Sequence, residues 1–280
     1  MLEFWTVNLL LPSDSNKLTF TTPSGLWELN QAKNFLAIKQ AIYQGQCGHT
    51  YELDVNVSLS GNGSAACDAC LDDLIPILLG SSYLSGLSVT IKHSRPYSDV
   101  SILQPSDYWP RERAMGTGQF CVVDDKDFVH KLEVIANNWG RVNSSEKVMV
   151  LLHHWLDALS CWSFEDFYLS ATTLLQIIAA TEKSVTGRHL YYFDAVVSAS
   201  ARVGITPLSD DFKNMRNNLI HEGRLLGGSF TGTNLDDCAQ VASDLMNWFD
   251  QYIHAVFGLG AVSNPRFSKN NFNSLNSYTL

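Results

Sequence analysis

The apolar pattern of this chain changes its period once, near residue 124, and this change constrains the fold more than any other feature. Before it, short apolar runs alternate with polar residues or are broken by turn residues, which is typical of strands. After it, apolar residues recur every three or four positions, which is typical of amphipathic helices. We therefore predict an α+β domain over residues 1–115, an all-α helical bundle over 116–262, and a polar, frayed C-terminal tail over 263–280.

The N-terminal part carries one clear strand pattern. Over residues 52–60, leucine or valine occupies every second position, which predicts a half-buried strand. Prolines and glycines between residues 94 and 119 mark the domain boundary. Further elements are expected as short strands at Leu18–Thr21, Leu26–Leu29 and Leu87–Lys92, a strand or short helix at Asn34–Gln44, and a helix at Ser64–Leu79 that Pro76 kinks or ends.

The second part predicts a series of helices with recognisable start and stop residues. These are Asp127–Trp139 ended by Gly140, Ser145–Leu159 capped by Ser144 or Ser145, Ser163–Lys183 capped by Ser163, Leu190–Val203 ended by Gly204, Ser209–Glu222 ended by Gly223, and Asn234–Phe257 ended by Gly258.

Charge and composition exclude several classes of protein. The chain has 19 basic and 28 acidic residues, so a net charge of -9 argues against a protein that coats duplex DNA. No apolar run reaches the ~20 residues of a membrane helix, and the N-terminus lacks the basic start of a signal peptide. The six scattered cysteines predict reduced thiols. We expect a cytoplasmic protein that does not contact a membrane.

A glycine-containing turn follows the best strand. Gly61, Gly63 and Ala66 are spaced as in a dinucleotide fingerprint and open the next helix. The acidic residue and the repeated βαβ units that such a site needs are missing, so a tight turn is the better interpretation. Phosphate or nucleotide sensing at this turn stays open as an alternative.

Cys67 and Cys70, together with Cys47 and His49, could supply four zinc ligands. Cys67 and Cys70 fall inside an apolar helix, where buried thiols are ordinary core residues. We therefore expect no metal and no cofactor.

One cluster suits chemistry on a phosphodiester. Within the expected helix Ser209–Glu222, Asn217 and His221 lie four residues apart and share a face, which the long side chain of Arg216 reaches. Arginine binds phosphate oxygens in pairs, and histidine transfers protons near neutral pH. On spacing alone, a solvated helix face is the simpler interpretation.

The order of the helices around this cluster resembles the HEPN family of α-helical domains. The family's mark is an Arg, a polar residue and a His at a helix end, with four to six residues between the Arg and the His. Here four residues separate Arg216 from His221, and Asn217 is the polar residue. Phe167–Lys183 is similar to the family's upstream helix, with Glu182 at its acidic position. The ApeA-like HEPN domains are the most similar subgroup.

The resemblance covers about residues 124–262 and implies a metal-independent endoribonuclease of defence or toxin type. HEPN domains pair as homodimers that place two motifs in one cleft. In that scheme His221 transfers a proton as a ribose 2′-OH attacks the adjacent phosphate, and Arg216 stabilises the charge that develops. Asn217 orients His221 or a phosphate oxygen. Glu182 either orients Arg216 or is a solvated carboxylate at the end of its helix. The substrate would be single-stranded RNA, which suits an acidic protein with a narrow cleft.

Two alternatives remain. The helical part could keep the HEPN fold and work as a non-catalytic binding or assembly module, or the chain could be a nucleotide-sensing regulatory protein. The N-terminal region resembles no family. By analogy with sensor domains that precede HEPN domains, we expect it to bind a regulatory partner or ligand.

Overall fold

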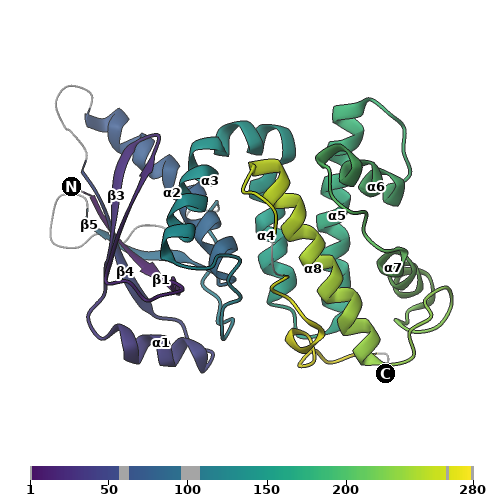
Figure 1. Cartoon of the computed structure of the whole chain (residues 1–280). Helices are drawn as coiled ribbons and strands as arrows, with labels where there is room; N and C mark the ends of the chain where they lie inside the picture. The colour runs from purple at the N-terminus through teal and green to yellow at the C-terminus, as the bar shows by residue number, and fades with distance from the viewer. Residues whose placement is uncertain (1, 57–62, 96–107, 263–264, 279–280) are drawn as a thin grey trace. The chain divides into compact units, whose positions relative to one another are not determined.

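The computed structural model describes residues 2–56, 63–95, 108–262 and 265–278, apart from the side chains of residues 63–67 and 95. The chain forms two compact units, Met1–Gly140 and Arg141–Leu280. The first combines an antiparallel sheet with helices and the second is helical (Figure 1). This is the predicted order of a mixed part followed by an all-helical part.

The elements are, in chain order, β1 (Leu2–Val7), β2 (Lys17–Thr22), β3 (Gly25–Gln31), α1 (Phe35–Tyr43), β4 (His49–Val55), α2 (Gly63–Ser85), β5 (Thr90–Arg95), α3 (Asp125–Glu146), α4 (Val148–Leu159), α5 (Phe164–Thr186), α6 (Tyr192–Val203), α7 (Asp210–Glu222), α8 (Leu235–Phe257) and the 3-10 turn η1 (Lys269–Asn271). Among the described residues, no helix combines the length and the apolarity needed to cross a membrane.

The sheet of the first unit has the order β2-β3-β4-β1-β5, and every neighbouring pair is antiparallel. Its core face is apolar, with Phe4 of β1 opposite Leu53 of β4. Helices α2 and α3 pack on this side of the sheet (Figure 1). Gly80 allows them to approach closely, because a Cβ there would lie 3.0 Å from Leu132 Cδ1 and 3.2 Å from Ile135 Cγ2.

The first half of α3 is therefore part of the first unit's core. The compact units divide at Gly140, whereas the sequence predicts a boundary at residue 115. Strand β1 was not predicted, although it is paired on both sides by β4 and β5.

Helix α3 also covers one edge of the sheet, at strand β2. The Thr21 backbone N–H of edge strand β2 donates to Glu133 Oε1 at 2.8 Å, and Asn137 Nδ2 donates to the Thr21 carbonyl at 3.4 Å. Asp125, at the start of α3, accepts the Ser13 backbone N–H at 2.8 Å. These bonds satisfy backbone groups that an edge strand otherwise leaves open.

The other face of the sheet carries half-buried polar side chains. Asp54 accepts a 3.1 Å hydrogen bond from Asn30 Nδ2, and its neighbours include Glu3 and Glu52. Burial, together with repulsion from the nearby glutamates, raises the pKa of Asp54 to about 6, although the Asn30 bond opposes the rise.

In the second unit, the structure confirms several predicted helix ends. Ser163 caps α5 by accepting the Asp166 N–H, and Ser209 caps α7. Asn234 begins α8 with a capping box. Glycines in the left-handed region end α6, α7 and α8, namely Gly204, Gly223 and Gly258.

Other predicted boundaries are wrong. Helix α3 continues through Gly140 to Glu146, because this glycine does not adopt the left-handed conformation that ends a helix. Helix α2 continues past Pro76 to Ser85, because the residues that follow the proline are buried in the core. Helix α4 begins after Lys147 in the left-handed region, not at either of the predicted serines, and Asn143 Oδ1 of α3 accepts the Met149 N–H in its first turn at 3.0 Å.

Three further expectations have mixed outcomes. The segment Asn34–Gln44 contains helix α1 (Phe35–Tyr43), and a helix was one of the two forms expected. Strand β5 lies a few residues later than predicted, and β4 ends at Val55. The remainder of the strand predicted over 52–60 falls largely outside the described residues.

The prediction of a frayed C-terminal tail is also wrong. Arg266 forms a 2.7 Å ion pair with Asp250 of α8, and their side chains are 3% and 0% exposed. Phe267 and Phe272 are buried. The Phe164 N–H at the start of α5 donates to the Asn276 carbonyl at 2.9 Å. The tail packs because these few residues have buried partners, although its average composition is polar.

An ionic cluster with two buried carboxylates joins four helices of the second unit. Arg202 of α6 donates from both Nη atoms to Glu146 at 2.9 Å and from Nε to Glu182 of α5 at 2.6 Å. Tyr252 of α8 donates to Glu146 Oε2 at 2.6 Å, and Ser198 donates to Glu182 Oε1 at 2.7 Å. Burial lowers the pKa of Arg202, but the bonds to the two carboxylates outweigh it and raise the pKa above its usual value.

Replacing this arginine tests the cluster. We expect Arg202→Met to lower the free energy of unfolding by about 3 kcal/mol in chemical denaturation, because it leaves two buried carboxylates without a cation. Arg224→Met is the matched control, since Arg224 pairs with Glu222 on the surface, and it should cost less than about 0.5 kcal/mol. Adding Glu182→Gln to Arg202→Met should restore part of the loss. Equal effects of the two single substitutions would contradict a structural role for the cluster.

Asp54 generates a prediction on pH dependence. Its pKa is higher in the folded than in the unfolded chain, so this carboxyl lowers stability as the pH rises from about 4 through 6. Asp54→Asn keeps an acceptor for Asn30 and removes the charge. We expect it to stabilise the protein by about 1 kcal/mol at pH 7.5, a value reduced for the side chain's partial exposure, and to have little effect at pH 4. Thermal unfolding at the two pH values measures the difference, and destabilisation at pH 7.5 would disprove the assignment.

Candidate functional site

The candidate motif lies on α7, which is attached to the second unit by one apolar face. Phe212, Met215 and Asn218 are buried at helical spacing, and the Phe212 ring lies 5.6 Å from that of Tyr168 in α5. This packing leaves Asn217 partly exposed and His221 exposed. Asn217 and His221 therefore lie outside the buried face of α7 and are accessible to solvent, as their spacing predicts.

Arg216 is held by a ring and an amide. Its Cζ lies 5.5 Å from the centroid of the Tyr192 ring, at the start of α6, which is a cation–π distance. Its Nη1 donates to Asn217 Oδ1 at 3.1 Å. Its Nε is buried and has no hydrogen-bond partner. Burial raises the pKa of the Tyr192 hydroxyl, and the charge of Arg216 opposes this rise.

No carboxylate compensates the charge of Arg216 within the described part of the chain. Arg202 and Arg266, by contrast, each pair with buried carboxylates. Anions are attracted to a guanidinium that keeps N–H donors and has no counter-charge.

His221 occupies the last turn of α7. Its side chain is exposed, and none of the described residues forms a hydrogen bond or ion pair with it. An imidazole in this position is accessible to a bound ligand and to solvent. The structure thus places Arg216, Asn217 and His221 on one short helix, with a direct bond between the first two only.

The expectation for Glu182 needs correction. Glu182 is fully buried, and its carboxylate accepts hydrogen bonds from Ser198 and Arg202 and forms no hydrogen bond or ion pair with Arg216. Tyr192 and Asn217 hold Arg216 instead. Glu182 is also not a solvated residue at a helix end.

Two residues that the sequence analysis missed support the site. Tyr192 comes from another helix, and no local pattern connects it with Arg216. Asn218 is 3% exposed, and its Nδ2 donates to the carbonyls of Leu225 and Gly227 in the loop after α7. In the sequence, Asn218 falls on the same face of the helix as Phe212 and Met215. A polar residue on an apolar face indicates a buried side chain that forms hydrogen bonds, as Asn218 does.

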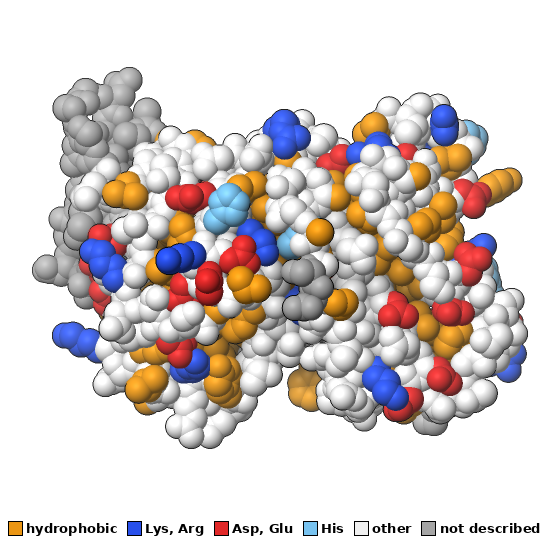
Figure 2. All heavy atoms as spheres, in the orientation of Figure 1, with side chains coloured by type: hydrophobic (Ala, Val, Ile, Leu, Met, Phe, Trp, Pro, Cys, Tyr) orange, Lys and Arg blue, Asp and Glu red, His pale blue; other side chains and the backbone are white. Residues whose placement is uncertain are grey.

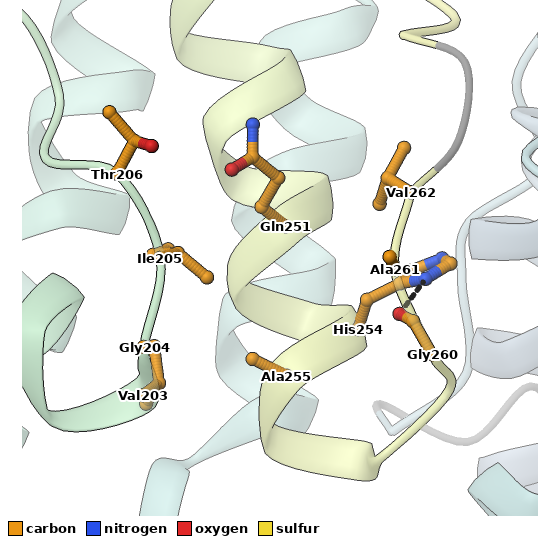
Figure 3. Close-up of a pocket in the computed structure, with 10 residues that line it drawn as sticks. All are labelled: Val203, Gly204, Ile205, Thr206, Gln251, His254, Ala255, Gly260, Ala261 and Val262. Atoms are coloured by element: carbon orange, nitrogen blue, oxygen red, sulfur yellow. Dashed lines mark hydrogen bonds between the residues drawn. The ribbon is translucent and has the colours of Figure 1, made fainter.

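The second unit also contains a separate cavity of about 330 Å³ (Figure 3). The segment between α6 and α7 lines one side, and Gln251 and His254 project from α8. His254 Nδ1 lies 3.1 Å from the carbonyl oxygen of Gly260. None of the motif residues lines this cavity, so it is distinct from the α7 site.

The two alternative ligand sites are only partly described. Across the described ranges, no three His, Cys, Asp or Glu side chains are arranged to hold a metal ion. Cys70 is buried, and Cys47 Sγ is 3.4 Å from Asn8 Nδ2. The side chain of Cys67 and the turn at Gly61 lie outside the described residues.

Comparisons with known proteins assign no relative to the chain. No family model matches it, and neither curated proteins nor solved structures gave a match.

Proposed function

We propose that the chain is a metal-independent endoribonuclease of the HEPN type that cleaves single-stranded RNA in the cytoplasm, in a defence or toxin role. The main support is the uncompensated guanidinium of Arg216, five residues before the exposed imidazole of His221 on the same helix. A phosphodiester supplies what the two groups lack, namely an anion for Arg216 and a proton-transfer partner for His221.

The proposed reaction is a transesterification. His221 takes the proton of a ribose 2′-OH while the 2′-oxygen forms a bond to the adjacent phosphorus. The bond from phosphorus to the 5′-oxygen of the next nucleotide breaks, and that oxygen receives a proton. Arg216 stabilises the charge on the non-bridging oxygens, and Asn217 keeps the guanidinium in place through its 3.1 Å bond.

A homodimer would complete the site. One imidazole accepts the proton from the 2′-oxygen, and a second, from another copy of α7, donates the proton to the leaving oxygen. Ile220, next to His221, is 44% exposed, which suits burial between two copies of α7.

The surface charge supports a local site rather than a broad basic surface. On the face drawn in Figure 2, basic and acidic side chains are interspersed. The charge of -9 disfavours wrapping of duplex nucleic acid, so selectivity would come from a few groups at α7.

Substitutions at the motif test the chemistry. We expect His221→Ala and Arg216→Ala each to reduce RNA cleavage in EDTA at least about 100-fold, because each removes a group that acts in the transition state. His189→Ala and Arg224→Ala are matched controls at exposed positions and should retain full activity. Gel assays with labelled single-stranded RNA measure the rates.

Two results would contradict the proposal. One is a requirement for a divalent metal ion, seen as loss of activity in EDTA and its recovery on addition of the metal. The other is RNA that the wild-type protein binds but never cuts, which would favour a non-catalytic HEPN module.

A mixing experiment tests the composite site. Wild-type protein and His221→Ala are mixed in equal amounts and allowed to exchange subunits. If each cut needs two imidazoles, activity per total protein falls to about a quarter, because only that fraction of dimers has both. Activity of about one half would indicate independent sites, and light scattering confirms the dimer.

A further inference from the structure

The start of α6 carries three consecutive aromatic rings, and two of them lie against cations of α7. The Tyr192 ring contacts Arg216, and the centroid of the Phe193 ring lies 5.7 Å from Lys213 Nζ. The third ring, that of Tyr191, is 86% exposed, more than any other aromatic side chain that the structure describes. Its side chain makes no hydrogen bond or ring contact with a described residue.

The position of Tyr191, more than its exposure, distinguishes it, because single exposed apolar side chains are common on protein surfaces. Trp162 is similarly exposed, at 81%, but it precedes α5, whereas Tyr191 follows the end of that helix. The 23 residues of α5 place the two rings about 35 Å apart along its axis. Of these two rings, only Tyr191 is adjacent in the chain to a residue that contacts Arg216.

The two cations on α7 keep donors for an anion, because neither Lys213 nor Arg216 forms an ion pair with a described residue. Carboxylates are also present, namely Asp194 in the first turn of α6 and Asp210 and Asp211 in that of α7. They repel a phosphate chain, so ionic contacts alone would hold RNA weakly here. Stacking of a base on an aromatic ring adds affinity that this repulsion does not oppose.

We propose that Tyr191 stacks on a base of the bound RNA, next to the phosphate that Arg216 contacts. This inference rests on the proposed function and names the residue that selects a single strand. A base inside a duplex is stacked between its neighbours and does not reach the ring, whereas an unpaired base does. Consecutive Cα atoms are about 3.8 Å apart, so the Tyr191 side chain begins one residue from the ring that contacts Arg216.

The experiment measures binding separately from cleavage. The protein is the full chain with His221→Ala, and the probe is an RNA hexamer of uridines with one 2-aminopurine, a base whose fluorescence is quenched by stacking. We expect saturable quenching. Adding Tyr191→Ala should abolish the quenching and weaken binding at least about fivefold, measured by anisotropy of a dye-labelled copy of the RNA. A hairpin with 2-aminopurine in its stem should show no quenching that depends on Tyr191.

Two further variants connect the effect with the ring at this position. Tyr191→Phe keeps an aromatic ring and should retain both quenching and affinity. Trp162→Ala is the matched control, because it removes a similarly exposed ring at the other end of α5, and it should change neither. In the chain with His221 intact, Tyr191→Ala should raise KM at least about fivefold and leave kcat nearly unchanged, as expected for a contact made before and during the reaction.

Any of three results would overturn the proposal. They are no saturable RNA binding at millimolar protein, quenching and affinity that Tyr191→Ala leaves intact, and an equal loss on Trp162→Ala. The second result, together with cleavage that depends on His221, would refute the stacking contact and leave the ribonuclease proposal standing. Quenching that depends on Tyr191, in a protein that never cuts RNA, would support the stacking contact and refute the ribonuclease.

Discussion

The second unit depends on one guanidinium that two buried carboxylates share. Arg202 of α6 forms ion pairs with Glu146 at the end of α3 and with Glu182 of α5, and the Tyr252 hydroxyl of α8 donates a hydrogen bond to Glu146. These interactions link α6 with the three other helices. A buried charge without its partner is costly, which makes this arrangement of helices hard to change. Helix α6 begins with Tyr192, the ring that contacts Arg216. The geometry of the candidate site thus depends on a cluster that touches none of the motif side chains.

Three arginines of this unit, Arg202, Arg216 and Arg266, differ in what surrounds their guanidinium groups, and this difference supports the functional proposal. Arg202 and Arg266 lie against carboxylates and stabilise the fold. Arg216 lies against a ring and an amide, and neither cancels its charge. In a protein with a net charge of -9, such a local positive charge on the same helix as an exposed imidazole provides a reason for an anionic substrate to bind there.

Local signals in the sequence predicted the parts of the fold that depend on neighbouring residues. Ser209 and Gly223 delimit α7, and the spacing of its apolar residues determines which side chains project outward. Partners distant in the sequence could not be predicted in this way. Strand β1 is defined by strands about 50 and 90 residues away, and Arg266 packs because Asp250 is buried on another element. Glu182 was assigned to Arg216 by resemblance, whereas the structure pairs it with Arg202.

The chemistry of the cut ends tests the central claim most directly. Attack by the 2′-oxygen, without a metal ion, leaves a 2′,3′-cyclic phosphate on one product and a 5′-hydroxyl on the other. Mass spectrometry of a short RNA cut by the purified protein in EDTA identifies both ends. We expect both of these ends with the wild-type protein and neither of them with His221→Ala. Products with a 3′-hydroxyl and a 5′-phosphate, or an RNA that stays intact, would contradict it.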